Sequence, residues 1–190
     1  MAAPVDVADA RTLPFAWYSD EETLRRERAL IFARSWQYSG RAAQVADPGS
    51  YLATDAGGVP ILVTRDAAGE LRAFVNVCRH RGAVLMEGGG TRKTLQCHYH
   101  AWTYGLDGSL RSAPRSDREL SFDDGEWSLL PAAVGMWGPF VFVNPDATAP
   151  SLGEHLGELP RILADTIDLD EIVFHSRVEF DAQANWKIVV

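Results

Sequence analysis

Short apolar runs separated by turn residues fill the middle of the chain, from Trp36 to about Val143. Residues 59–64 (VPILVT) and 71–77 (LRAFVNV) are rich in β-branched and aromatic side chains, and residues 65–69 between them are typical of a hairpin turn. Residues 140–143 (FVFV) have the length and composition of a buried strand. Short strands joined by turns predict a small antiparallel β module.

The segments on either side have helical periodicity. A helix is predicted to begin at Ser19, because Ser19 and Glu22 have the spacing of a capping box. Leucines recur at helical spacing over residues 152–165, where Pro160 must kink or divide the helix.

Near the C-terminus, residues 171–181 predict a long strand and residues 186–190 (WKIVV) predict the start of another. We therefore expect a mostly β protein with three parts. Residues 1–35 form an N-terminal extension and helix, residues 36–146 form the β module, and residues 147–190 begin an α+β segment.

Composition and charge narrow the function classes. The chain has 190 residues, of which 46% are hydrophobic and 23% charged, as in an ordinary globular protein. Its net charge of −8 disfavours a nucleic-acid partner, and no apolar run is long enough to predict a membrane span. The N-terminus lacks the pattern of a secretory signal. We expect a cytoplasmic protein whose two cysteines stay reduced.

Both cysteines lie in motifs that also contain histidine. Cys78 and His80 belong to the segment CRHRG, and Cys97 and His100 belong to the segment CHYH. Each segment supplies one thiolate and one imidazole, and each follows a β-rich run, so two loops at the tip of the module can converge on one site. In a Rieske centre, two cysteines hold one iron of a 2Fe-2S cluster and two histidines hold the other.

Other interpretations of these residues remain open. Two cysteines and two histidines also suit structural zinc, although a zinc finger usually takes its two cysteines from one element and its two histidines from another. A disulfide between Cys78 and Cys97 would leave both histidines unexplained. His98 could replace His100 as a ligand, but its spacing from Cys97 does not fit the motif.

The sequence resembles the N-terminal portion of the large (alpha) subunit of Rieske non-haem iron oxygenases, the ring-hydroxylating family. The segments CRHRG and CHYHAWTY match the family pattern C-x-H followed by C-x-x-H-x-W-x-Y. Trp36 and the stretch at residues 185–187 (NWK) match flanking family features. Ala101 departs from the pattern, because the family usually has glycine there. The resemblance implies a Rieske-type β module whose tip binds the cluster through Cys78, His80, Cys97 and His100.

The resemblance also implies a reaction and partners. Electrons from NAD(P)H reach the cluster through a reductase or a ferredoxin and pass to a mononuclear iron, which activates O2 to hydroxylate an organic substrate as a mono- or dioxygenase. In the family, the ligands of that iron follow the NWK stretch, and the subunits often form a homotrimer, with or without a small subunit. We therefore expect residues 147–190 to begin a truncated catalytic domain, this chain to contain no catalytic residues, and the chain alone to transfer electrons only.

Residues beside the ligands suggest how the cluster is tuned. Arg81, Tyr99 and Trp102 are candidates for contacts around it. High-potential Rieske proteins place a hydroxyl donor two residues after the second histidine, where this chain has Trp102. Because hydrogen bonds to the sulfurs raise the potential, we expect a value toward the low end of the Rieske range, about −150 mV.

Charge is uneven around the motifs. Residues 78–118 carry a net charge of +4, which leaves −12 for the rest of the chain. The basic residues are Arg79, Arg81, Arg92, Lys93, Arg111, Arg115 and Arg118. They form either an ordinary solvated surface or a docking surface for an acidic electron donor.

Two other functions stay open at this point. The chain could be a stand-alone Rieske ferredoxin-type electron carrier, although the extra segments at residues 1–35 and 150–190 argue against that. It could also be a structural zinc module without redox activity.

Overall fold

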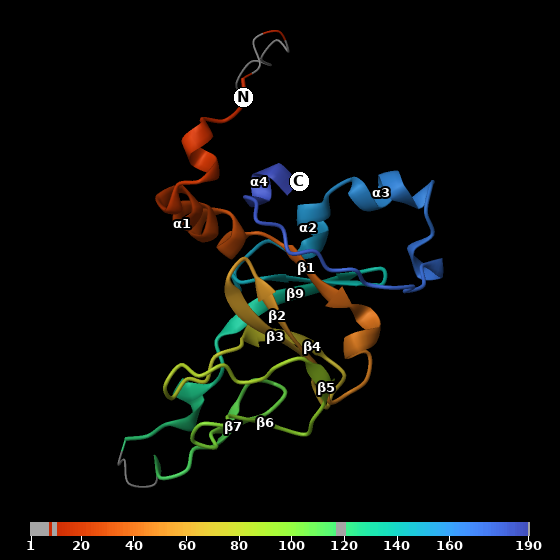
Figure 1. Cartoon of the computed structure of the whole chain (residues 1–190). Coiled ribbons are helices and arrows are strands. Elements are labelled where there is room, and N and C mark those ends of the chain that lie inside the picture. The colour runs from red at the N-terminus through yellow and green to blue at the C-terminus, as the bar shows by residue number, and fades with distance from the viewer. Residues whose placement is uncertain (1–7, 9–10, 117–120, 190) are drawn as a thin grey trace.

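Two antiparallel sheets form the central part of the molecule, as the computed structural model shows for residues 8, 11–116 and 121–189 (Figure 1). The larger sheet has the strand order β1-β10-β9-β4-β3-β2-β5, and the smaller sheet has the order β6-β7-β8. The larger sheet contains β1 (Gln37–Arg41), β2 (Ser50–Ala56), β3 (Val59–Arg65), β4 (Leu71–Val75), β5 (Gly89–Thr91), β9 (Pro131–Trp137) and β10 (Phe140–Asn144). The smaller sheet contains β6 (Leu95–Gln96), β7 (Thr103–Tyr104) and β8 (Leu110–Ser112). The predicted mostly β fold is confirmed.

The predicted hairpin is formed by β3 and β4, and Asp66 fixes its turn. The Asp66 carboxylate accepts hydrogen bonds from the backbone N–H groups of Ala68 and Glu70, both at 2.9 Å, and from Nε of Arg72 at 2.6 Å. The bond from Arg72 is the main reason why the pKa of Asp66 lies below its ordinary value. One carboxylate therefore closes the turn that precedes β4 and the first cysteine–histidine segment.

Strand β3 is buried on both faces. Leu62 packs with Tyr104 in a core between the two sheets, whereas Ile61 and Val63 pack with Val141 in a second core on the opposite face. All five side chains are fully buried. A strand with two covered faces explains why residues 59–64 are apolar without alternation.

The capping residue of the first helix, α1 (Glu21–Leu30), lies one residue later than the sequence predicts. Asp20 caps it, and the Asp20 carboxylate accepts from the backbone N–H of Thr23 at 2.8 Å and from its hydroxyl at 2.7 Å. The prediction of Ser19 as the start was wrong, because Asp20 itself provides the capping oxygen.

The predicted leucine-rich helix is divided, as expected. Helix α2 (Leu152–Leu156) ends at Gly157, which adopts a φ of +53°, and α3 (Leu159–Ala164) carries Pro160 in its first turn. Proline is tolerated there because the first N–H groups of a helix have no partner within the helix. The 3-10 helices are η2 (Phe15–Tyr18), η3 (Phe32–Arg34), η4 (Ala42–Val45), η6 (Asp124–Trp127) and η7 (Leu169–Glu171). Among the described residues, no helix has the length and apolar character needed to cross a membrane.

The two strands predicted near the C-terminus are not formed. Residues 172–185 contain no helix or strand, and Trp186–Val189 form a short helix, α4. Val173, Val178 and Phe180 in this segment are 84%, 69% and 88% exposed. Apolar alternation favours a strand, but a strand forms only beside a partner that accepts and donates its backbone hydrogen bonds. Among the described residues, no strand pairs with this segment through backbone hydrogen bonds, although the Arg41 guanidinium of β1 lies 3.7 Å from the centroid of the Phe174 ring.

Helices α1 and α4 meet through an ion pair that joins the two ends of the chain (Figure 1). The Glu27 carboxylate accepts from Nζ of Lys187 at 2.7 Å and from Nε1 of Trp186 at 2.9 Å. The Lys187 and Glu27 side chains are only 9% and 11% exposed. Phe32 packs edge-on against Trp186, with ring centroids 5.1 Å apart. The N-terminal helix therefore holds the C-terminal segment in place.

We predict that Glu27→Gln and Lys187→Met each lower the Tm, because each leaves a poorly solvated charge without its partner. The double variant should lose less than the sum of the single variants, since it leaves no unpaired charge. Thermal denaturation measures all three. The matched control is Glu22→Gln, whose pair with Arg25 on the same helix is exposed and contributes about 0–1 kcal/mol. Equal losses for Lys187→Met and Glu22→Gln would contradict the role of this ion pair.

This stabilisation should also depend on pH. The hydrogen bonds from Lys187 and then Trp186 lower the pKa of Glu27 from its ordinary value of 4.5. A lowered folded-state pKa stabilises the fold above pH 4.5, and this contribution is lost as the pH falls through the folded-state pKa. The Tm difference between the wild-type chain and Glu27→Gln should therefore be constant near neutral pH and should shrink on acidification. A constant difference through the acid range would contradict the assignment.

Candidate metal centre

Two loops of the same shape carry the cysteine–histidine motifs. The first follows β4 and the second follows β6. In each loop the cysteine carbonyl accepts a hydrogen bond from the N–H four residues later, Gly82 to Cys78 and Ala101 to Cys97, both at 3.0 Å. Each cysteine N–H donates to the carbonyl five residues later, at 2.8 Å in both loops. The chain thus closes around each thiol in the same way.

The Asn76 side chain joins the two ends of the first loop through hydrogen bonds. Its side-chain amide donates to the Met86 carbonyl at 2.8 Å, and its side-chain oxygen accepts from the Met86 N–H at 3.0 Å. The Asn76 carbonyl also accepts from the N–H of Leu85 at 3.2 Å. Asn76 is 2% exposed, so these bonds satisfy a buried polar side chain while they fix the ends of the loop.

Both cysteine thiols are buried and free. Cys78 is 2% exposed and Cys97 is 3% exposed, and no disulfide joins them. Burial raises the pKa of Cys78, and the nearby Cys97 adds to this effect. Since a bound metal cation offsets the cost of a buried thiolate, this environment suits a metal ligand.

The two histidines meet beside these thiols. The His80 and His100 rings lie 4.7 Å apart in an edge-on arrangement. Nδ1 of His100 is buried and has no hydrogen-bond partner among the residues that the structure describes, which is costly for a polar atom unless another group binds it. Burial, His100 and Arg81 lower the pKa of His80, which favours the neutral imidazole that binds metals. The four residues therefore fit a metal centre that takes two thiolates and two neutral imidazoles.

The four side chains are divided between the two loops, with one cysteine and one histidine on each. Within residues 8, 11–116 and 121–189, no group of three or more histidine, cysteine, aspartate or glutamate side chains is arranged to hold a single metal ion. A Rieske centre does not need such a group, because each of its irons takes only two protein ligands. His98, the alternative ligand, lies exposed on the second loop.

Two of the three other predicted site residues contact the histidines directly. The Trp102 indole stacks on His80, with centroids 4.9 Å apart and planes 7° apart. The Tyr99 and His100 rings are in contact, with centroids 3.8 Å apart, and Tyr99 is 57% exposed. Arg81 is exposed and affects His80 through its charge.

The structure adds Tyr104, which the sequence analysis did not single out as a site residue. Its hydroxyl lies 3.5 Å from Sγ of Cys78 and accepts a hydrogen bond from the N–H of Arg79 at 3.1 Å. Burial and Cys78 raise the pKa of Tyr104, so the hydroxyl keeps its proton and can donate it to a Cys78 thiolate. The final tyrosine of the segment CHYHAWTY was the available sequence signal, but its contact with the other loop appears only in the fold.

A cavity of about 890 Å³ opens beside both histidines. It is lined by His80, Arg81, Tyr99, His100, Trp102, Pro114, Arg115, Ser116, Ser121, Phe122, Glu126 and Trp127. The thiol side of the candidate centre is buried, whereas the imidazole side faces this cavity. The imidazole side is therefore the more accessible side of the candidate centre.

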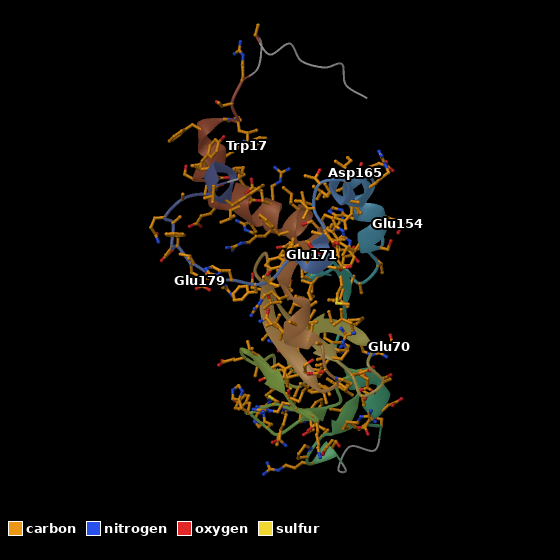
Figure 2. All side chains as sticks on the ribbon, turned by 90° about the vertical axis from the view of Figure 1, so that its right-hand side faces the viewer. Trp17, Glu70, Glu154, Asp165, Glu171 and Glu179 are labelled. Atoms are coloured by element: carbon orange, nitrogen blue, oxygen red, sulfur yellow. The ribbon has the colours of Figure 1, made fainter. Side chains whose placement is uncertain are left out.

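Some of the basic residues noted around the motifs lie beside this cavity. Arg81 and Arg115 line the cavity. Arg118 lies outside the described residues. The labelled acidic side chains Glu154 and Asp165 lie at the other end of the molecule, with the C-terminal helices (Figure 2). Glu126 also lines the cavity, so side chains of both signs lie beside the histidines.

Comparisons with known proteins match this geometry. The family described as "Rieske [2Fe-2S] domain" matches residues 35–132. The chain is 37% identical over 185 residues to choline monooxygenase, chloroplastic, of Spinacia oleracea, covering 95% of this chain and 42% of that protein. It is 35% identical to the carnitine monooxygenase oxygenase subunit of Acinetobacter pittii (strain PHEA-2), covering 95% of this chain and 49% of that protein. The chain thus spans less than half the length of these relatives.

Solved structures give the same result. The apo form of the quaternary ammonium Rieske monooxygenase CntA matches with a TM-score of 0.87 and 33% identity, covering 94% of this chain and 52% of that chain. Naphthalene 1,2-dioxygenase with bound indole matches with a TM-score of 0.72 and 33% identity, covering 78% of this chain and 34% of that chain.

We predict that Tyr104→Phe lowers the reduction potential of a cluster bound here, because it removes a hydroxyl that favours the more negative, reduced state. If the hydroxyl favours the reduced over the oxidised cluster tenfold, its loss lowers the reduction potential by about 60 mV, the value for a one-electron couple. Potentiometric titration measures it. Tyr99→Phe is the control, since the Tyr99 hydroxyl is not the one beside Cys78. An unchanged potential in Tyr104→Phe would exclude this hydrogen bond as a tuning element.

Ala101 gives a prediction about the second loop. It adopts a φ of +59°, a conformation that costs an alanine about 1–2 kcal/mol and a glycine much less. Ala101→Gly should therefore raise the free energy of unfolding by about 1 kcal/mol. The control Ala147→Gly, at an exposed position without a positive φ, should lower it. If both substitutions destabilise the chain in denaturant titrations, Ala101 is not strained.

Proposed function

The chain belongs to the Rieske [2Fe-2S] domain family, and from this premise we propose that it is the electron-transfer portion of an oxygenase that hydroxylates an organic substrate with O2 and electrons from NAD(P)H. Cys78, His80, Cys97 and His100 are the proposed cluster ligands. The observation that carries this proposal is the convergence of two equally shaped loops, which together present two buried free thiols and a buried, unpaired imidazole nitrogen.

When bound, a Rieske 2Fe-2S cluster supplies a site that accepts and releases one electron at a time. The residues of this chain define how that site behaves. Cys78 and Cys97 provide thiolates in a buried pocket that excludes water. His80 and His100 provide neutral donors, which make the site less negative than four thiolates would. The Tyr104 hydroxyl donates to Cys78 and stabilises negative charge on its sulfur.

In the proposed whole protein, residues 36–146 form the cluster domain and residues 147–190 begin the catalytic domain with its mononuclear iron. A reductase or ferredoxin donates the electrons, and the subunits form a homotrimer, with or without a small subunit. The relatives named for choline and carnitine support a quaternary ammonium compound as the substrate class. The proposed location is the cytoplasm, where the two thiols stay reduced.

Redox titration tests the proposal. The chain, purified without oxygen, should take up about one electron per chain at a potential toward the low end of the Rieske range, about −150 mV. The reduced form should give the electron paramagnetic resonance signal of a 2Fe-2S cluster with histidine ligands. Cys97→Ser is the matched control and should lose the signal. A chain with no redox transition would contradict the proposal, and a potential well above zero would contradict the expected tuning.

The two arginines that line the cavity, Arg81 and Arg115, predict how an electron donor binds. Reduction by an acidic one-electron donor should slow as ionic strength rises, because opposite charges accelerate the encounter and salt screens them. Stopped-flow measurements with a ferredoxin between about 0.01 and 0.15 M salt cover Debye lengths from about 30 to 8 Å. Arg81→Gln should flatten this dependence, whereas Arg161→Gln, on α3 at the other end of the molecule, should not. A rate that does not respond to salt would rule out electrostatic steering.

A further inference from the structure

Trp102 lies flat against one of the proposed ligands. Its indole and the His80 imidazole are 4.9 Å apart between centroids, and their planes differ by 7°. The indole is 6% exposed. A flat contact of this kind opposes rotation of the imidazole about its Cβ–Cγ bond, because the ring cannot turn without colliding with the indole. The orientation of His80 therefore depends on the position of Trp102.

Two further rings hold Trp102 in turn. Phe122 and Trp127 meet its indole edge-on, with centroids 5.7 and 5.6 Å away and planes at 89° and 84°. Phe122 and Trp127 also stack on each other at 5.9 Å, with planes 8° apart. Edge-on and offset-stacked arrangements are the favourable geometries for aromatic pairs. We refer to Trp102, Phe122 and Trp127 as the aromatic box.

Hydrogen bonds order the segment that carries Phe122 and Trp127 and attach it to the smaller sheet. The Asp123 carboxylate accepts from the N–H of Gly125 at 2.9 Å and caps η6. After η6, the N–H of Leu129 donates to the carbonyl of Gly108, in the turn between β7 and β8, at 2.8 Å. Two rings from a segment outside both ligand loops thus pack against Trp102.

The aromatic box also forms one wall of the cavity beside the histidines. His80 and all three residues of the box line that cavity. If the Trp127 ring were removed, the space behind Trp102 would become continuous with the cavity. Trp102 could then tilt, and water would reach the imidazole side of the centre more easily.

We propose that Phe122 and Trp127 are positioning residues for the cluster: through Trp102, they fix the orientation of the His80 ring and limit the access of water to the iron that His80 holds. This inference rests on the proposed function, since it requires a cluster at His80. It assigns a role to a segment outside both cysteine–histidine motifs. The arginine beside the first ligand adds to the contact, because the Arg79 guanidinium lies 5.9 Å from the centroid of Trp127.

Substitution of Trp127 in the full chain tests the inference. Trp127→Leu should assemble a cluster with the iron and sulfide content of the wild type. Its electron paramagnetic resonance signal and visible circular dichroism should broaden or shift. Its cluster should be lost in air about three- to tenfold faster, the change expected for the loss of the aromatic pair with Trp102. Trp127→Phe should restore most of the wild-type behaviour, because it keeps a ring. Trp17→Leu, a tryptophan far along the chain from the motifs, is the control and should match the wild type.

Phe122→Leu keeps the inference testable if Trp127→Leu does not fold, and it should shift the same signals in the same direction. Wild-type spectra and loss rates in both Trp127→Leu and Phe122→Leu would overturn the role of the box. Equal effects of Trp127→Phe and Trp127→Leu would also overturn it, because the ring would then not matter. A wild-type chain that holds no cluster at all would instead refute the proposed function.

Discussion

Two buried thiols and two imidazoles at one tip form the constraint on which the rest of the structure depends. Burial disfavours the thiolate form of Cys78, and Nδ1 of His100 has no partner within the described residues. Such groups are costly in a protein interior unless a metal binds them. The fold nevertheless holds them together, through the same hydrogen-bond pattern in both loops. An arrangement that is unfavourable alone and favourable with a metal is typical of a metal centre.

The surrounding architecture supports those two loops. Strand β3 is covered on both faces, so the larger sheet is a rigid base, and the smaller sheet places the second loop over it. Buried side chains connect the base to the site: Asn76 holds the first loop, and the Tyr104 hydroxyl crosses from the second loop to Cys78. At the opposite end, Glu27 ties α4 to α1. Buried side-chain bonds thus hold both candidate ligand loops in position.

The sequence predicted the parts that depend on local patterns. The hairpin around Asp66 and the divided leucine-rich helix follow from short-range composition and spacing, and the structure forms both. The four candidate ligands come from the same kind of pattern. The structure brings the two loops that carry them together, and their role as cluster ligands stays a prediction. The C-terminal strands were wrong, because alternation indicates a strand without showing whether a partner strand exists. Tyr104, Phe122 and Trp127 were missed because their contacts join segments far apart along the chain, and no spacing rule reports such contacts. The strain at Ala101 was visible only as a departure from glycine, and the φ of +59° gives its cause.

The central claim is that this tip holds a 2Fe-2S cluster, and the metal and sulfide content of the chain tests it most directly. Iron, zinc and acid-labile sulfide should be measured on protein purified without oxygen from cells well supplied with iron. The account predicts about two irons and about two sulfides per chain, with little zinc. About one zinc per chain and no sulfide would contradict it and would identify a structural zinc site instead.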